Sequence, residues 1–153
     1  MTYNANKVTG KGTFGMLYRA AVGETGEIVA IKKVLQDRRR KNCKLQIMKE
    51  LNHTNVIGLR HAFYITDNRL DDVYLNIVMD FVPEIIYRVV KHYKRMHPQV
   101  PALLIKLYSY QLMRTLAYIH ARGITHCDIK PQNVLADTAT THCGFATAAQ
   151  RSR

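Results

Sequence analysis

The sequence contains few cysteines, and those few do not suggest a disulfide-stabilised protein. Its 153 residues include three, Cys43, Cys127 and Cys143. An odd number of cysteines without a secretion signal is typical of reduced thiols, because disulfides form in oxidising compartments. We therefore expect a cytoplasmic or nuclear protein.

Long apolar runs are also missing. The most hydrophobic stretches, residues 73–82 and 102–108, are short and interrupted by charge, whereas a membrane-spanning helix needs about 20 apolar residues. The first twelve residues have no apolar core, so we expect no signal peptide and no membrane contact. Repeats and low-complexity segments are absent. A hydrophobic content of 47% is that of one globular domain.

Acidic residues are scarce: 11 Asp and Glu stand against 23 Lys and Arg, which gives a net charge of +12. Such a surface attracts polyanions, including ATP and acidic or phosphorylated substrates. The densest basic run is residues 38–41, which we interpret as a solvated loop. A nuclear-import or nucleic-acid patch is the alternative. Because neither interleaved aromatic residues nor zinc-ligand spacing accompanies the charge, we expect no specific nucleic-acid partner.

The hydrophobic pattern predicts strands first and helices later. Strand-like runs are separated by polar or glycine-containing turns and occupy residues 6–10, 16–22, 28–34, 61–65 and 73–79. Leu45, Met48 and Leu51 recur at helical spacing between the third and fourth runs. Pro83 disfavours a continuing strand.

Two longer helices are predicted beyond Pro83. They cover residues 84–97 and 102–122, with Gly123 as a helix C-cap, and a loop with two very short strands follows. The plan is an α+β fold in two lobes. An N-lobe of residues 1–79 holds a five-stranded sheet and one helix. Residues 80–84 form a hinge, and residues 85–153 form a partial, mostly helical C-lobe.

A glycine-rich turn, Gly10, Gly12 and Gly15, lies between the first two predicted strands. Glycines at this spacing let the backbone approach phosphate oxygens and donate amide hydrogen bonds. The motif alone is weak evidence for a phosphate site, but its place between two strands argues against a dinucleotide-binding fold.

Lys32 of "VAIK" lies on the third predicted strand, where it can reach phosphates; a surface lysine is the alternative.

The octapeptide "HCDIKPQN", residues 126–133, is the most specific motif. Asp128 is positioned to accept a proton from a substrate hydroxyl, and Lys130 to meet a transferred phosphate. Asn133, five residues after the aspartate, is a candidate metal ligand.

With these motifs in this order, the sequence resembles a eukaryotic protein kinase of the glycogen synthase kinase-3/shaggy family. The resemblance is carried by "VAIKKVLQD", "LQIM", "VYLNIVMDFVPE", "YRVVKHY", "IKLYSYQLMRTLAYIH" and "DIKPQN", and it runs from about residue 3 to 150. It implies a kinase-like N-lobe and phosphorylation of Ser or Thr with magnesium-ATP, often beside a priming phosphate. It also implies that Leu17 and Ala30 enclose adenine, whose edge pairs with the backbone of Asp80 and Val82 behind Met79.

The chain departs from this family at the metal site. Where the family has Asp-Phe-Gly, this chain has Gly144, Phe145 and Ala146. Glycine carries no carboxylate, so magnesium binding is doubtful.

Helix C and the catalytic loop depart as well. Lys44 stands at the position of the glutamate that pairs with Lys32, and two cations at ~4 Å repel by ~4 kcal/mol at an effective dielectric of 20. Cys43 and Cys127 stand where the family has arginines that bind the priming phosphate. A thiol cannot supply the guanidinium fork.

Two further departures concern length. The segment between Asn133 and Gly144 is about three residues shorter than the resemblance implies, so we expect strain in this hairpin. The sequence is also expected to lack the activation segment, the peptide platform and the later helices. The helix at residues 102–122 would then expose apolar side chains, and a protein partner could cover them.

Zinc is a weaker interpretation. His126, Cys127, His142 and Cys143 are possible ligands, but neighbouring residues on a strand point to opposite faces and the spacing matches no common site.

Three functions remain open. The first is a nucleotide-binding kinase homologue that has lost phosphoryl transfer, with ATP bound without magnesium because Lys32, Lys44 and Lys130 supply positive charge. The second is a non-functional product of a decaying gene copy. The third is an active kinase.

Overall fold

The computed structural model describes residues 2–12, 15–36, 43–67, 72–96, 99–145 and 150–151. The chain divides into two compact units, which are described separately. The first comprises Met1–Asn42 and Gly58–Phe81, and the second Cys43–Ile57 and Val82–Arg153. No helix within the described ranges is long and apolar enough to cross a membrane.

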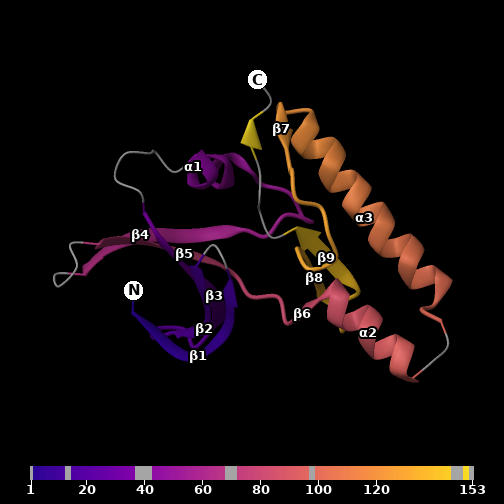
Figure 1. Ribbon diagram of the computed structural model, residues 1–153, viewed down its shortest axis with the longest axis horizontal. Coiled ribbons are helices and arrows are strands. Elements are labelled where there is room, and N and C mark those ends of the chain that lie inside the picture. The colour runs from indigo at the N-terminus through magenta and orange to yellow at the C-terminus, as the bar shows by residue number, and fades with distance from the viewer. Residues whose placement is uncertain are drawn as a thin grey trace. The chain divides into compact units, whose positions relative to one another are not determined.

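The first unit is a curled antiparallel sheet of five strands (Figure 1). The strands are β1 (Tyr3–Gly12), β2 (Gly15–Val22), β3 (Ile28–Leu35), β4 (Leu59–Asp67) and β5 (Asp72–Asp80), in the order β1-β2-β3-β5-β4. Side chains alternate between faces along a strand. The core is therefore built from every second residue: Ala20, Val22, Val29, Ile31 and Val78.

The second unit combines three helices with short strands. The helices are α1 (Cys43–Glu50), α2 (Ile86–Met96) and α3 (Ala102–His120). The strands are β6 (Glu84–Ile85), β7 (Ile124–Thr125), β8 (Val134–Asp137), β9 (His142–Phe145) and β10 (Gln150–Arg151). Together with the sheet of the first unit, they confirm the predicted α+β fold.

Two hydrophobic clusters hold the second unit together. In the first, Ile47 and Leu51 from the α1 region pack with Val56, Ile119 and Ile124. In the second, Val89 of α2 and Tyr108 of α3 pack with Val134, Ala136, Cys143 and Phe145 of the β8–β9 hairpin. The α1 helix thus belongs by its packing to the unit that contains α3.

The predicted helix boundaries were partly wrong. The helix expected from residue 84 begins at Ile86, because Glu84 and Ile85 pair as strand β6 with Ala136 and Leu135. Pairing with a distant strand overrides the local helical pattern here. The second predicted helix, residues 102–122, corresponds to α3, which ends at His120. Gly123 closes the turn beyond it with a φ of 65° and donates its N–H to the His120 carbonyl.

Asn55, in the loop after α1, connects this loop to α3 and β9. It is 3% exposed, and its side-chain amide donates hydrogen bonds of 2.8 Å to Gln111 Oε1 and to the Cys143 carbonyl. Its own carbonyl accepts hydrogen bonds from Thr115 Oγ1 at 3.2 Å and from the Phe145 N–H at 3.3 Å. One buried asparagine thereby fixes three segments that lie far apart in the sequence.

Replacing Asn55 by alanine should destabilise the second unit by about 1–3 kcal/mol, because Asn55→Ala removes the buried hydrogen bond from its amide to the Cys143 carbonyl. Chemical denaturation followed by circular dichroism measures this loss. Asn52→Ala is the matched control, since Asn52 is exposed and hydrogen bonds Tyr118 through its backbone N–H. Equal unfolding midpoints for the two variants would contradict the prediction.

Candidate functional site

The predicted site residues fall into two groups, one in each unit. Gly10, Gly12, Gly15, Leu17, Ala30, Lys32 and Asp80 belong to the first unit, whereas Val82, Asp128, Lys130 and Asn133 belong to the second. The joint role proposed for Asp80 and Val82 therefore stays a prediction, as does the repulsion between Lys32 and Lys44.

One face of the sheet in the first unit gathers the predicted nucleotide-binding side chains. Leu17 lies opposite Lys32 in the β2–β3 register, and Ala30 lies opposite Met79 in the β3–β5 register. Because Ala30 and Lys32 are two residues apart on one strand, all four side chains share a face. This face is opposite the one that carries the core. Arg19 lies opposite Ala30 and adds a second cation beside Lys32 on this partly apolar face, which suits a base and its phosphates.

The glycines of the turn have different physical roles. Gly15 has a φ of 119°, and a Cβ added there would overlap the Lys33 carbonyl oxygen. Gly10 has more space: among the residues that the structure describes, an added Cβ would meet only the Leu17 Cβ, at 4.0 Å. Gly12 pairs with Gly15 at the end of the hairpin, and Thr13 and Phe14 lie outside the described residues. Gly15 is thus required by the fold, whereas Gly10 leaves the sheet surface open to a ligand.

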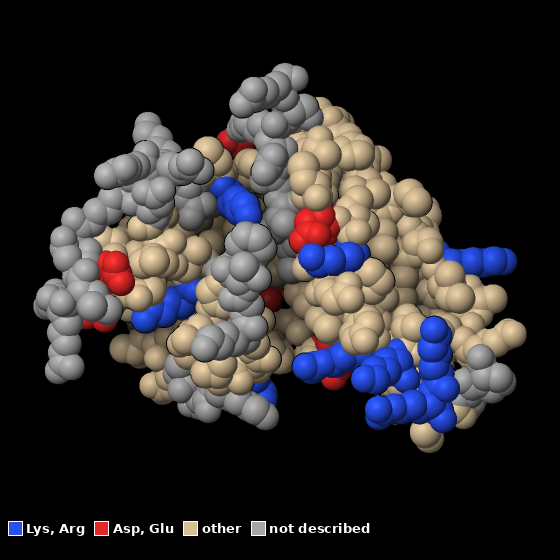
Figure 2. Space-filling model, in the orientation of Figure 1, with Lys and Arg blue, Asp and Glu red and all other residues tan. Residues whose placement is uncertain are grey.

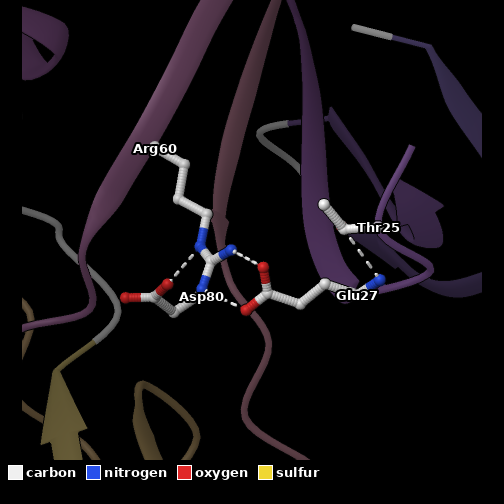
Figure 3. Close-up of polar contacts among 4 residues, drawn as sticks. All are labelled: Thr25, Glu27, Arg60 and Asp80. Carbon is white, nitrogen blue, oxygen red and sulfur yellow. Dashed lines mark hydrogen bonds and ion pairs between the residues drawn. The ribbon is translucent and has the colours of Figure 1, made fainter. Parts of the chain in front are cut away.

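Arg60 of β4 links the ends of two other strands in the first unit (Figure 3). Its guanidinium binds both carboxylate oxygens of Glu27, at 2.5 and 2.7 Å, and its Nε donates to Asp80 Oδ1 at 2.5 Å. The hydrogen bond from Arg60 lowers the pKa of Glu27. These side chains are 38–52% exposed, so water and salt screen the pairs. Their effect is to orient Asp80 rather than to stabilise the fold.

The backbone around Asp80 fits this arrangement. The Asp80 N–H donates to the Gly58 carbonyl at 3.2 Å. Gly58 carries no side chain, and a Cβ there would overlap the Asp80 carboxylate. Asp80 is thus held toward β4 by both its side chain and its N–H, and no sequence motif predicted this contact.

The loop at residues 126–133 brings its three predicted residues together. Lys130 Nζ lies 2.9 Å from Asp128 Oδ1. The Asn133 side-chain amide donates to Asp128 Oδ2 at 2.7 Å and to the Asp128 carbonyl at 2.8 Å. The hydrogen bonds from Lys130 and then from Asn133 lower the pKa of Asp128. The carboxylate is therefore ionised near neutral pH.

Cys127 shapes the same loop through its backbone. It has a φ of 63°, its side chain is exposed, and its thiol donates to the Thr125 carbonyl at 3.5 Å. A left-handed residue other than glycine stores about 1–3 kcal/mol of strain. On either side of it, His126 is buried and packs on Phe145 in a tilted arrangement with ring centroids 4.5 Å apart, whereas Asp128 is partly exposed.

Gly144 lies against the loop after α1. Phe145 forms a parallel bridge with Val56, and the Ile57 N–H donates to the Phe145 carbonyl at 3.3 Å. A Cβ at Gly144 would lie 2.9 Å from the Asn55 carbonyl oxygen. Any side chain at this position would therefore require the Asn55 backbone to shift.

The short connection between Asn133 and Gly144 closes a regular hairpin. Strands β8 and β9 pair without interruption from Val134 with Phe145 to Asp137 with His142. The Asp137 carboxylate accepts hydrogen bonds from the Ala139 N–H and the Thr140 hydroxyl. Thr141 has a φ of 53°, which is unfavourable for a β-branched residue. The left-handed residue of this hairpin thus lies in the turn, away from Gly144.

The structure describes some of the remaining positions at which the sequence departs from the resemblance. Cys43 and Lys44 are exposed at the start of α1, and Ala146 lies outside the described residues. Cys143 is fully buried, which raises the pKa of its thiol to about 11. Among the residues that the structure describes, no three His, Cys, Asp or Glu side chains are arranged to hold a metal ion.

A comparison with protein families decides the ancestry. The model of the protein kinase domain matches residues 3–150. The chain belongs to the protein kinase family. Its curled antiparallel sheet and its helices agree with the predicted α+β, protein-kinase-like fold. Membership implies ATP binding in general terms.

Magnesium fits the kinase domain poorly. The Asp128 carboxylate is bound by Lys130 and Asn133, and the Asn133 amide nitrogen points at Asp128. Gly144 adds no ligand atom. Magnesium prefers six oxygen ligands with one or two carboxylates. The Asn133 amide oxygen alone does not meet that requirement.

Replacement by alanine should change the stability at Gly15 but not at Gly10. We expect Gly15→Ala to destabilise the kinase domain by about 1–3 kcal/mol, because its positive φ and the Lys33 carbonyl leave no room for a methyl group. Gly10→Ala is the matched control and should leave the thermal midpoint nearly unchanged. A Gly15→Ala variant as stable as Gly10→Ala would contradict this reading.

Removing Lys130 should raise the pKa of Asp128 toward its ordinary value of about 3.9, because Lys130 is the main cause of its lowering. With a lowered folded-state pKa, the Asp128 interactions stabilise the fold above the ordinary pKa and are lost as pH falls through the lowered one. An NMR titration of the Asp128 carboxyl in Lys130→Ala measures the change. Lys106→Ala is the control, and an equal pKa in both variants would refute the assignment.

Proposed function

We propose that this chain is a nucleotide-binding member of the glycogen synthase kinase-3/shaggy branch that has lost phosphoryl transfer. The observation that carries the proposal is Gly144, a buried glycine at the position where the resemblance puts the magnesium-binding aspartate. Kinases achieve phosphoryl transfer almost entirely by positioning and electrostatic stabilisation, in which that carboxylate and its metal ions are central. A binding function needs neither.

Nucleotide binding is supported by the sheet face of the first unit. Leu17 and Ala30 would enclose adenine, Lys32 would meet the phosphates, and the open surface beside Gly10 would admit them. The backbone of Asp80 would accept a hydrogen bond from the adenine edge, with the Val82 N–H as the second contact. Since Lys32 supplies positive charge without a metal, we propose that ATP binds independently of magnesium.

An active serine/threonine kinase is the second candidate. It is favoured by the Asp128, Lys130 and Asn133 contacts, which keep a base and a cation together. The third possibility, a non-functional gene product, is distinguished by limited proteolysis, because a product that does not fold would be digested completely.

A protein partner is proposed for α3, and a cytoplasmic or nuclear location for the chain. Support for the partner comes from four large apolar side chains of this helix that are more than half exposed: Leu103, Ile105, Tyr110 and Met113. Monomeric proteins rarely expose contiguous apolar patches of large size.

ATP should raise the thermal midpoint of the full chain equally with magnesium and with a chelator. At about 100 times the dissociation constant, binding adds ~2.7 kcal/mol, or roughly 5–11 °C for a chain of this size. Gly10→Ala should keep the unliganded midpoint but reduce the ATP shift, because its methyl group fills the open surface. A shift seen only with magnesium would overturn the metal-independent site.

Phosphate transfer from radiolabelled ATP to a serine peptide is the decisive comparison for catalysis. We expect the chain and its Asp128→Ala variant to give the same background signal. Incorporation that depends on Asp128 would establish the active kinase and end the proposal.

A further inference from the structure

The outward face of α2 is strongly basic. Arg88, Lys91, Lys94 and Arg95 are all exposed, and the helix contains no Asp or Glu. The spacing of Arg88, Lys91 and Arg95 puts them on one face, about 4.5 and 6 Å apart along the helix axis. Figure 2 shows Lys and Arg side chains gathered over α2. We call these four residues the basic face.

The basic face has no partner within the described part of the chain. None of its four cations forms an ion pair with any residue that the structure describes. Like charges three or four residues apart destabilise a helix. The arrangement therefore opposes folding slightly unless something outside the helix compensates for it.

Helix stability explains only half of these charges. Lys94 and Arg95 lie in the last turn, where cations interact favourably with the helix dipole. Arg88 is the third residue of the helix, where the dipole favours acids instead, and no acidic residue lies in that first turn. Arg88 and Lys91 thus call for an explanation other than stability.

The opposite face of α2 is already occupied. Val89 is 6% exposed, and Ile86 and Tyr93 pack with it against Tyr108 and the β8–β9 hairpin. A partner or a membrane that bound this face would have to displace the core residues from it. A partner that leaves the fold intact therefore binds α2 through the basic face. Tyr87 and Met96, near the two ends of the helix, are 46% and 66% exposed.

We propose that the basic face of α2 is a docking surface for an acidic protein segment. Carboxylates would pair with Arg88, Lys91 and Arg95, and an apolar side chain of the same segment would cover Tyr87. A peptide supplies both kinds of group, whereas a phosphate backbone supplies only charge. The basic face is also about 10 Å long, which is short for nucleic-acid binding that relies on many phosphate contacts.

Fluorescence anisotropy of the full chain with a labelled peptide of mixed Glu and Leu tests this surface. We expect Arg88→Gln with Lys91→Gln to weaken binding by about fivefold or more. Lys49→Gln with Arg122→Gln is the matched control, because it removes two exposed cations that lie outside α2 and α3, and it should change affinity less than about twofold. Loss of Arg88 does not threaten the helix, and circular dichroism melts verify that both variants fold.

Three further probes complete the test. The Gln-for-Glu analogue of the peptide should not bind. An oligothymidylate and phosphatidylserine vesicles should bind more weakly than the acidic peptide, and their binding should fall equally in both double variants. Tighter binding of either probe, equal loss of peptide binding in the two variants, or no peptide binding at all would overturn the docking surface. None of these results depends on whether the chain binds ATP.

Discussion

The contact between β9 and the loop after α1 is the constraint on which the second unit depends. Phe145 bridges to Val56, and Gly144 lies so close to the Asn55 carbonyl that a side chain would not fit without a shift. The Asn55 amide then ties the same strand to Gln111 of α3. Since both hydrophobic clusters of this unit meet at these segments, one close backbone approach organises the packing of α1, α3 and the hairpin.

The same contact gives Gly144 a structural role in addition to its place in the proposed function. Under the proposed function, it is a glycine in place of a metal-binding aspartate. In the folded chain it is also a packing residue whose missing side chain permits the contact with Asn55. The loop that holds Asp128 contacts the same strand through His126 and Phe145, and it keeps its ion pair and its amide hydrogen bonds. The chain therefore keeps the contacts among Asp128, Lys130 and Asn133, whereas Gly144 supplies no carboxylate.

Much of the fold followed from local patterns, and the failures occurred where distant segments meet. The strands of the first unit were predictable because β-branched and apolar residues alternate between glycine-containing turns. Glu84 and Ile85 were predicted as helix but pair with β8, 50 residues further on. Likewise, no motif indicated Asn55 or Arg60, because each is a single polar residue whose partners lie elsewhere in the chain.

The sequence by itself determined the family and the chemical groups available, because a glycine-rich turn, Lys32 and "HCDIKPQN" occur in a fixed order and carry their chemistry in their side chains. Only the tertiary structure decided the surroundings of these and neighbouring residues. Gly15 has a positive φ and no room for a side chain, whereas Gly10 has room for one. The Asp80 carboxylate binds Arg60, and Gly144 is buried against Asn55. Such roles depend on distances between residues that are remote in the sequence, and only folding sets those distances.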